Sequence, residues 1–295
     1  MKTIALLTDF GVVDNFVGVI KGVILRISSQ VNLVDITHNV SPQDIFQGAF
    51  LLKSSFKYFP RGTIFLVIVD PGVGSSRKAI VVRTKNYFFV GPNNGVLSLA
   101  VSEDGIEEIV SIENKKYFLE PLSNTFAGRD IFAPVTGYLC QGVKLNALGP
   151  SLETIEELNL PKPVINPLKG KKERFSKSEV DFCDKVDKNT LQGRVIYIDR
   201  FGNLITNIPK EIFNHFVKNK KFKITIKNKE VTSIAHFYQS VERGKLLVIF
   251  NSFNLLEIAV GCGRASECLK VKRDEEVRVV VKERETALDS ISGER

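Results

Sequence analysis

The first 140 residues alternate short, almost continuously apolar runs with stretches in which apolar positions recur every three or four residues. The apolar runs at 3–8, 31–36 and 63–70 have the pattern of strands that are buried on both faces of a parallel sheet. Two further strands are expected at 79–83 and 87–90. This alternation predicts an α/β N-terminal domain with a mainly parallel sheet.

Helix start and stop signals place the connecting helices. Asp14 is the expected N-cap of the first helix, and Ser41 followed by Pro42 is expected to open the second, which Pro60 ends. Residues 130–140 are expected to form a later helix that begins at an acidic residue. The first two helices would then serve as right-handed crossovers between parallel strands.

Beyond about residue 190 the helical periodicity fades. Short β-branched runs separated by turn residues follow at 194–198, 222–226, 246–250 and 277–281, and they predict a smaller antiparallel β-barrel. The stretch between the two patterns is rich in Pro, Lys and Glu, as is usual for a domain boundary. The expected organisation is an α/β domain at 1–165, a linker at 166–190, a C-terminal barrel at 191–285 and a polar tail at 286–295.

Composition narrows the class of protein. The chain has 295 residues, of which 43% are hydrophobic and 25% are charged, and these are ordinary values for a folded globular protein. Its apolar runs are too short for a membrane span or a secretory signal, so we expect a cytoplasmic protein without a membrane partner. The four cysteines form no Cys-x-x-Cys pair and the three histidines are widely spaced, which argues against a disulfide framework and a metal site.

The formal net charge of +8 raises the alternative of a nucleic-acid-binding protein. Six lysines lie between 218 and 229, but they alternate with Phe222, Ile224 and Ile226, as on the solvent face of a half-buried strand. Nucleic-acid binding would favour exposed aromatic rings and arginines. No nucleic-acid partner is therefore expected, and salt-dependent binding of single strands to these lysines is the competing hypothesis.

Two aspartates stand just beyond the carboxyl ends of predicted strands, where ligands bind in parallel α/β sheets. Asp9 ends the first apolar run and Asp70 ends the third, and each precedes a loop that contains glycine. Capping of a turn is an equally good interpretation of either residue. The chain has no P-loop and no G-x-G-x-x-G, so a ligand other than a nucleoside triphosphate or a Rossmann dinucleotide is favoured.

Three other groups of polar residues each have an interpretation of their own. Asp199 is followed by Phe201 and Asn203, and a ring beside an amide suits a purine, which stacks on the ring and hydrogen-bonds along its edge. His38 is interpreted as a structural, hydrogen-bonded histidine. Residues 91–95 are interpreted as a hairpin turn.

Several segments, in this order along the chain, resemble the S-adenosyl-L-methionine (SAM) hydroxide adenosyltransferases, which are SAM hydrolases related to fluorinase and chlorinase. The matching segments are Thr8–Gly11, Val34–His38, Asp70–Gly74 with Arg77, Pro92–Gly95, Gly128–Phe132, Asp199–Asn203, and Ser252 with Glu257–Ala259. The resemblance implies a homotrimer in which each active site lies between the N-terminal domain of one subunit and the C-terminal domain of its neighbour. The implied reaction is attack of water or hydroxide on C5′ of SAM, which releases adenosine and L-methionine without a metal or other cofactor.

The resemblance also implies roles for individual residues. Asp9 is similar to the ligand of the ribose diol, and Asp14 and Asp199 are similar to the partners of the methionine ammonium group. Phe201 and Asn203 match the adenine contacts. The other implied substrate contacts are Ser252, Glu257 and the backbone near Val260.

The water-activating set of the family is an aspartate, an arginine and a histidine. Asp70 and Arg77 match the first two, and a carboxylate at position 70 favours the hydrolase branch because it would repel a halide. The histidine position holds Ala127, whose side chain cannot carry a proton. Three explanations are open: an engineered substitution, which the intact surrounding motif favours, a natural variant served by Asp70 and Arg77 alone, or a SAM- or adenosine-binding protein without turnover. We expect retained binding and impaired hydrolysis.

Overall fold

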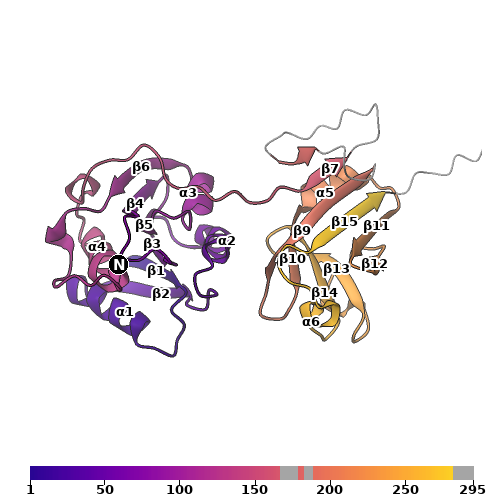
Figure 1. The fold of residues 1–295 in the computed structure, drawn as a ribbon, viewed down its shortest axis with the longest axis horizontal. Helices are drawn as coiled ribbons and strands as arrows, with labels where there is room; N and C mark the ends of the chain where they lie inside the picture. Colours follow the sequence, from indigo (N-terminus) through magenta and orange to yellow (C-terminus); the bar gives the residue numbers. More distant parts are fainter. Residues whose placement is uncertain (167–178, 183–188, 282–295) are drawn as a thin grey trace, which may run out of the picture. The chain divides into compact units, whose positions relative to one another are not determined.

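The computed structural model describes residues 1–166, 179–182 and 189–281, and these fall into two compact units, 1–159 and 160–295. Most of the predicted linker at 166–190 and all of the predicted tail at 286–295 lie outside the described residues. Each unit has its own sheet and its own hydrophobic core (Figure 1). None of the helices in the described ranges has the length and hydropathy that a membrane span requires.

The N-terminal unit is built on a sheet with the strand order β2-β1-β3-β5-β4-β6. The first four strands in this order are parallel, and they are β2 (Val31–Thr37), β1 (Lys2–Thr8), β3 (Ile64–Ile68) and β5 (Phe88–Pro92). Strand β4 (Ala79–Thr84) is antiparallel to both of its neighbours, β5 and β6 (Ile106–Ser111). The α/β domain with a mainly parallel sheet is therefore confirmed, with β6 as a strand that the sequence pattern did not predict.

Alternate side chains of the central strands enter two separate cores, one on each face of the sheet. Ile4 and Leu6 of β1 belong to one core, and Ala5 and Leu7 belong to the other. The first face is covered by α1 (Phe16–Ile27) and α4 (Ala133–Cys140), and the second by α2 (Ile45–Ser55) and α3 (Ser98–Asp104) (Figure 1). Burial on both faces explains why the strands are apolar at every position rather than at every second one.

All three predicted helix starts are wrong, and two of them belong to α1 and α4. Helix α1 begins after Asn15, so the exposed Asp14 lies in the preceding loop and is not the N-cap. The helix predicted from residue 130 begins earlier, because a π-helical turn at Gly128–Phe132 leads directly into α4. Asp130 is fully buried in this turn, where Arg129 and a backbone amide bind its carboxylate, so it does not open the helix.

Helix α2 is capped by Asp44 and not opened by Ser41 as predicted. The Asp44 side chain accepts a hydrogen bond from the Gln47 backbone amide at 3.0 Å. The Gln47 side-chain oxygen in turn accepts one from the Ser41 backbone amide at 2.8 Å. The Gln47 side chain thus reaches back past the N-cap, whereas in a capping box it would bind the N-cap amide itself. Ser41 and Pro42 lie in the turn that precedes the helix.

The C-terminal unit contains an antiparallel sheet with the strand order β12-β11-β15-β9-β10-β14-β13. The two end strands, β12 and β13, contact each other, so the sheet is nearly closed and the predicted barrel is confirmed. The strands are β9 (Thr190–Ile198), β10 (Leu204–Pro209), β11 (Phe222–Ile226), β12 (Lys229–Val231), β13 (Leu246–Phe250), β14 (Leu255–Val260) and β15 (Glu276–Val281). Two short strands, β7 (Val164–Asn166) and β8 (Asp181–Phe182), extend the sheet beside β9.

The C-terminal unit contains helices, although the sequence pattern indicated little helical structure there. Helix α5 (Lys210–Val217) follows β10, and α6 (Ala265–Leu269) follows β14. Helix α5 buries an apolar stripe in the barrel core, and the Phe213 ring contacts the rings of Phe222 and Phe250 with centroids 5.2 and 5.3 Å away. The stripe has the spacing of a helix, so the signal was present in the sequence.

The aromatic cluster on the α2 and α3 face provides a test of the N-terminal core. Phe65 of β3 is fully buried, and its ring stacks on Phe89 at a centroid distance of 5.0 Å. We expect Phe65→Ala to lower the free energy of unfolding by about 3–5 kcal/mol, because it removes buried surface and leaves a cavity. Urea denaturation measures this loss. The exposed Tyr58→Ala is the control, with an expected loss below about 0.5 kcal/mol, and equal losses would contradict the core assignment.

Candidate active site

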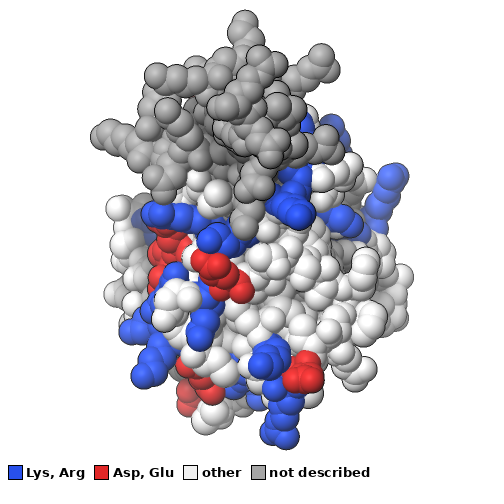
Figure 2. Space-filling model, turned by 90° about the vertical axis from the view of Figure 1, so that its right-hand side faces the viewer, with Lys and Arg blue, Asp and Glu red and all other residues white. Residues whose placement is uncertain are grey.

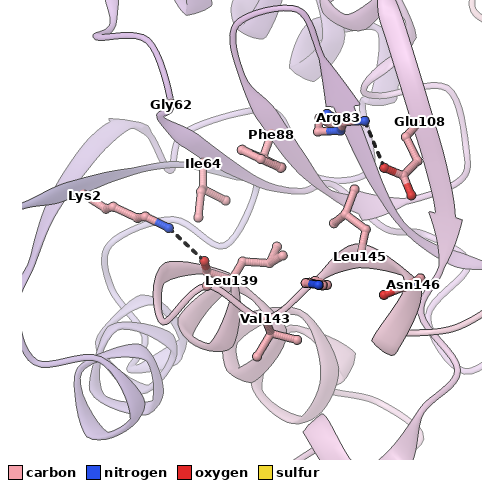
Figure 3. Close-up of a pocket in the computed structure, with 12 residues that line it drawn as sticks. Lys2, Gly62, Ile64, Arg83, Phe88, Glu108, Leu139, Val143, Leu145 and Asn146 are labelled. Atoms are coloured by element: carbon pink, nitrogen blue, oxygen red, sulfur yellow. Dashed lines mark hydrogen bonds and ion pairs between the residues drawn. The ribbon is translucent and has the colours of Figure 1, made fainter.

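A pocket of about 500 Å³ in the N-terminal unit lies at the amino ends of the parallel strands (Figure 3). Lys2, Ile64 and Phe88 line it from the starts of β1, β3 and β5. Two of its cations are engaged within the protein: Lys2 Nζ donates to the Leu139 carbonyl at 3.1 Å, and Arg83 pairs with two glutamates. Ligands of parallel sheets bind at the opposite, carboxyl edge, and the predicted residues Asp9 and Asp70 follow the strands at that edge.

The loops that follow β1 and β3 leave this carboxyl edge side by side. The two strands are neighbours in the sheet, and Thr8 at the end of β1 pairs with Ile68 at the end of β3. Asp9 therefore comes directly after Thr8, and Asp70 comes two residues after Ile68. The structure brings the two predicted aspartates to the same end of adjacent strands.

Asp70 and Arg77 form a two-pronged ion pair within one loop. Arg77 Nε donates to Oδ1 at 2.8 Å, and a terminal nitrogen of Arg77 donates to Oδ2 at 2.5 Å. The Asp70 and Arg77 side chains are only 5% and 14% exposed, and the guanidinium also lies over the Phe132 ring at 5.3 Å. Such a fork fixes the plane of the carboxylate, so Asp70 is held in one orientation.

The loop that carries Asp70 and Arg77 packs against the segment that contains Ala127. Gly74 has a φ of +79°, and a Cβ at this position would lie 2.4 Å from the Asn124 carbonyl oxygen. Only glycine tolerates both the conformation and the contact. Ala127 is buried in the core on the α1 and α4 face. The three positions of the predicted water-activating set thus lie on two loops in direct contact.

The turn after β5 supports the same loop. Residues 91–95 do not form the predicted hairpin, because β5 leads into α3 and not into an adjacent antiparallel strand. Asn94 Nδ2 donates to the Val69 carbonyl at 2.8 Å, immediately before Asp70. The Asn93 side-chain oxygen accepts from the Glu156 backbone amide at 2.8 Å. The side chains of Asn93 and Asn94 thus hold neighbouring segments in place at the carboxyl edge. This role explains why two asparagines stand together in this short turn.

Asp9 is half-buried and accepts a hydrogen bond at Oδ2 from the Gln43 backbone amide at 2.8 Å. Beside it, the rings of Phe10, Phe16 and Phe126 contact one another, with centroid distances between 5.3 and 6.0 Å. Asp14 is exposed in the loop between Asp9 and α1. The edge thus presents carboxylates beside an aromatic wall that links the first loop to the segment around Ala127.

In the C-terminal unit, the predicted residues Asp199 and Asn203 bind each other across the turn between β9 and β10. Asp199 Oδ1 accepts from the Asn203 backbone amide at 2.8 Å, and Oδ2 accepts from its side-chain nitrogen at 3.0 Å. Asn203 is buried, whereas the Phe201 ring between them is 74% exposed. The turn therefore presents an exposed ring beside an amide whose orientation a carboxylate fixes.

Glu257 of β14 is buried and is bound by a residue that the sequence did not single out. Tyr238 donates its hydroxyl to Glu257 Oε1 at 2.8 Å. Burial raises the pKa of Glu257 above its ordinary value, and the charge of Asp199 adds to this, while hydrogen bonds from Tyr238 and Asn251 act in the opposite direction. Burial, followed by the contact with Glu257, also raises the pKa of Tyr238. Glu257, Tyr238 and Asp199 therefore form one electrostatic group.

The remaining predicted residues lie at opposite ends of β14 and are not brought together. Ser252 is exposed in the turn that precedes the strand, and Val260 ends the strand. The Val260 carbonyl accepts from the Gly263 backbone amide at 3.1 Å, so this oxygen already has a partner. Glu257, between the two, is the member of this set that lies beside Asp199.

The lysines at 218–229 follow the predicted pattern of a half-buried strand. Ile224 and Ile226 of β11 are buried in the barrel core, while Lys223 pairs with Glu230 at 2.8 Å and Lys227 with Glu275 at 3.5 Å. Figure 2 shows a face on which basic side chains are interspersed with acidic ones and with uncharged surface. This mixing weakens the positive field that binding of a phosphate backbone requires.

Comparison with known proteins assigns both units. Residues 4–149 match the SAM hydroxide adenosyltransferase N-terminal domain, and residues 193–278 match the C-terminal domain of the same family. The chain belongs to the SAM hydroxide adenosyltransferase family. It is 34% identical over 289 residues to the (R)-S-adenosyl-L-methionine hydrolase of Methanocaldococcus jannaschii, covering 95% of this chain and 96% of that one.

Two further relatives of this chain support the assignment. The (R)-S-adenosyl-L-methionine hydrolase of Salinispora tropica is 30% identical over 277 residues, which cover 94% of this chain and 97% of the relative. The crystal structure of an uncharacterized conserved protein from Thermotoga maritima is similar with a TM-score of 0.81 and 38% identity. That match covers 94% of this chain and 99% of the other, so both units belong to the shared architecture.

The burial of Glu257 predicts how the stability of the protein depends on pH. Because its folded-state pKa lies above the ordinary Glu value of 4.5, its contribution to stability is fully present below that value and is lost as the pH rises through the folded-state pKa. We expect Glu257→Gln to gain stability relative to wild type as the pH rises from about 4 to about 7. Urea denaturation at several pH values measures the difference, and the exposed Glu242→Gln is the control. A wild-type-minus-variant difference that stays constant with pH would contradict the assignment.

Proposed function

We propose that this chain catalyses the hydrolysis of SAM to adenosine and L-methionine. The observation that carries the proposal is the oriented Asp70–Arg77 pair at the carboxyl end of β3, in a chain whose two units both match the SAM hydroxide adenosyltransferase family. The names of the relatives from M. jannaschii and S. tropica agree with this activity.

The chemistry places simple demands on the site. The oxygen of water forms a bond to C5′ while the C5′–S bond breaks, and the sulfur keeps the electron pair as a neutral thioether. Because the sulfonium is already an activated leaving group, the reaction needs no acid and no metal to assist its departure. The protein has to align the water and accept its proton. Arg77 holds both oxygens of Asp70, and their remaining lone pairs are available to the attacking water.

The substrate contacts follow from the same proposal. Asp9 receives the ribose hydroxyls, and Asp14 and Asp199 receive the methionine ammonium group. The exposed Phe201 ring stacks on adenine while the Asn203 amide, which Asp199 orients, reads the edge of the base. The other substrate contacts that we propose are Ser252, Glu257 and the backbone near Val260.

Ala127 makes a defined prediction about rate. An acid–base group typically contributes about 10²–10⁴-fold to a rate, so we expect Ala127→His to raise adenosine release by about this factor with little change in SAM affinity. Chromatography of adenosine measures the rate, and calorimetry measures the affinity. Ala127→Leu is the control of similar bulk without a proton-carrying group, and we expect it to give no gain.

The outcomes of this experiment separate two functions. Slow release by wild type that Ala127→His accelerates supports hydrolysis. Binding of SAM without adenosine release by either protein would overturn it and would establish the alternative, a SAM- or adenosine-binding protein without turnover. Slow release by wild type that Ala127→His leaves unchanged would show that Asp70 and Arg77 suffice.

We further propose that the chain forms a homotrimer in which each active site combines the N-terminal unit of one subunit with the C-terminal unit of its neighbour. The exposed apolar side chains near the predicted residues support this proposal. Val12 and Val13 lie in the loop between Asp9 and α1, and Val13 is 95% exposed. Apolar groups grouped at a site are usually covered by a ligand or by another chain.

Mixed oligomers test the shared site. Asp70→Asn and Asn203→Ala are each expected to be inactive alone, since each removes a different half of the site. When equal amounts are unfolded and refolded together, about one quarter of the sites in a trimer combine two intact halves, so about a quarter of the wild-type activity should return. No recovery would place both halves in one subunit. Light scattering should give three times the chain mass of 33.0 kDa, and a monomer mass would contradict the trimer.

A further inference from the structure

The buried side chain of His38, just after β2, links two parts of the N-terminal unit. Its Nδ1 lies 2.9 Å from the Thr8 hydroxyl at the end of β1, and its Nε2 lies 3.0 Å from Asp35 Oδ1. Asp35 also binds Lys21 of α1, with Nζ 2.6 Å from Oδ2. A polar chain therefore runs from Lys21 through Asp35 and His38 to Thr8, the residue immediately before Asp9.

Asp35 determines which nitrogen of His38 carries the proton. Partial burial raises the pKa of Asp35, but the hydrogen bonds from Lys21 and His38 lower it overall, so Asp35 is a carboxylate and can only accept. The negative charge of Asp35 beside Nε2 favours the tautomer of His38 that carries its proton there, which leaves Nδ1 to accept from the Thr8 hydroxyl. The Thr8 oxygen in turn accepts from the Phe10 backbone amide at 3.2 Å. The proton order along the chain is thereby set.

The backbone of residues 38–43 also contacts the turn that contains Asp9. The His38 carbonyl accepts from the Gly11 amide at 2.7 Å. The Gln43 amide donates to Asp9 Oδ2 at 2.8 Å. Gln43 has a φ of +67°, a left-handed conformation that costs energy in a residue other than glycine and is kept where the surrounding contacts demand it. Thr8, the Asp9 carboxylate and Gly11 are therefore all bound to residues 38–43.

We propose that His38 is a positioning residue that, through Thr8, sets the Asp9 carboxylate at the place where it binds the two hydroxyls of the ribose ring. This inference rests on the proposed function, in which Asp9 receives the ribose diol. A carboxylate that must meet two hydroxyls at once tolerates little displacement. In well-organised sites, a misplacement of about 1 Å lowers the reaction rate on the order of 10²-fold. Neither Thr8 nor His38 touches the substrate, and their role is to fix Asp9.

A comparison of two nucleosides separates this role from a general contribution to folding. Adenosine carries the diol, and 2′,3′-dideoxyadenosine lacks it but keeps the base and C5′. We expect wild type to bind adenosine more tightly in calorimetry. In His38→Leu and Thr8→Val the affinity for adenosine should fall by about tenfold or more, while the affinity for dideoxyadenosine stays unchanged, so that the preference for the diol is lost.

Two conservative variants and one matched control complete the design. Thr8→Ser keeps the hydroxyl, and His38→Asn can place an amide oxygen near Nδ1 as the acceptor, so both should retain much of the preference. Thr63→Val removes the hydroxyl of another buried threonine, whose Oγ1 donates to the Pro60 carbonyl at 2.7 Å, at the amino end of β3. It should leave the preference at its wild-type value.

Each outcome has one meaning. If His38→Leu weakens both nucleosides equally, or if it keeps the preference for adenosine, the positioning role is overturned while the proposed function stands. If wild type binds both nucleosides equally, Asp9 does not bind the diol and the inference fails at its premise. If wild type binds neither SAM nor adenosine, the proposed function itself fails. Loss of the preference in His38→Leu and Thr8→Val, with its retention in Thr63→Val, supports the positioning role.

Discussion

Burial of β1 and β3 on both faces is the constraint on which the N-terminal unit depends. Ile4 and Leu6 enter one core and Ala5 and Leu7 the other, so the side chains in the middle of the strand are not free for polar chemistry. Charged groups are expensive in such an interior unless they are paired. Polar residues are therefore placed beyond the strand ends, where loops from neighbouring strands meet. The position of Asp9 and Asp70 is a consequence of how the sheet is covered.

The loops at that edge are irregular but are not loosely held. Asn94 fixes the backbone before Asp70, Gly74 allows the loop to contact Asn124, and Arg77 fixes the carboxylate itself. The first two contacts join residues from different connections of the sheet, and the third closes one loop on itself. Preorganised groups of this kind lower the cost of ordering a reacting water molecule, and this suits a reaction whose leaving group needs no assistance.

The sequence predicted the two-unit architecture because both hydrophobic patterns are strong: continuous runs in the first unit and short β-branched runs in the second. It failed where local signals compete. Asp14 and Ser41 are good caps in isolation, but Asn15 and Asp44 precede the helices. Before the second helix, the backbone amide of Gln43, between Ser41 and Asp44, binds the Asp9 carboxylate. Helix α5 was overlooked although its apolar spacing was visible.

The candidate site was predictable in part for the same physical reasons. Strand ends identify Asp9 and Asp70 by rule, whereas the partners of buried groups come from distant positions. Tyr238 binds Glu257 across 19 residues, and the His38 contacts with Thr8 span 30. No spacing rule links such residues, because only the folded topology makes them neighbours.

The turn between β9 and β10 has a thermodynamic consequence. Asp199 uses both carboxylate oxygens to hold Asn203. A cation that binds one of those oxygens therefore changes how firmly the Asn203 amide is held. An amino group and a purine bound at this turn would then influence each other's affinity reciprocally, with a coupling free energy carried by five residues. The two chemically distinct ends of one ligand would then not be bound as independent fragments.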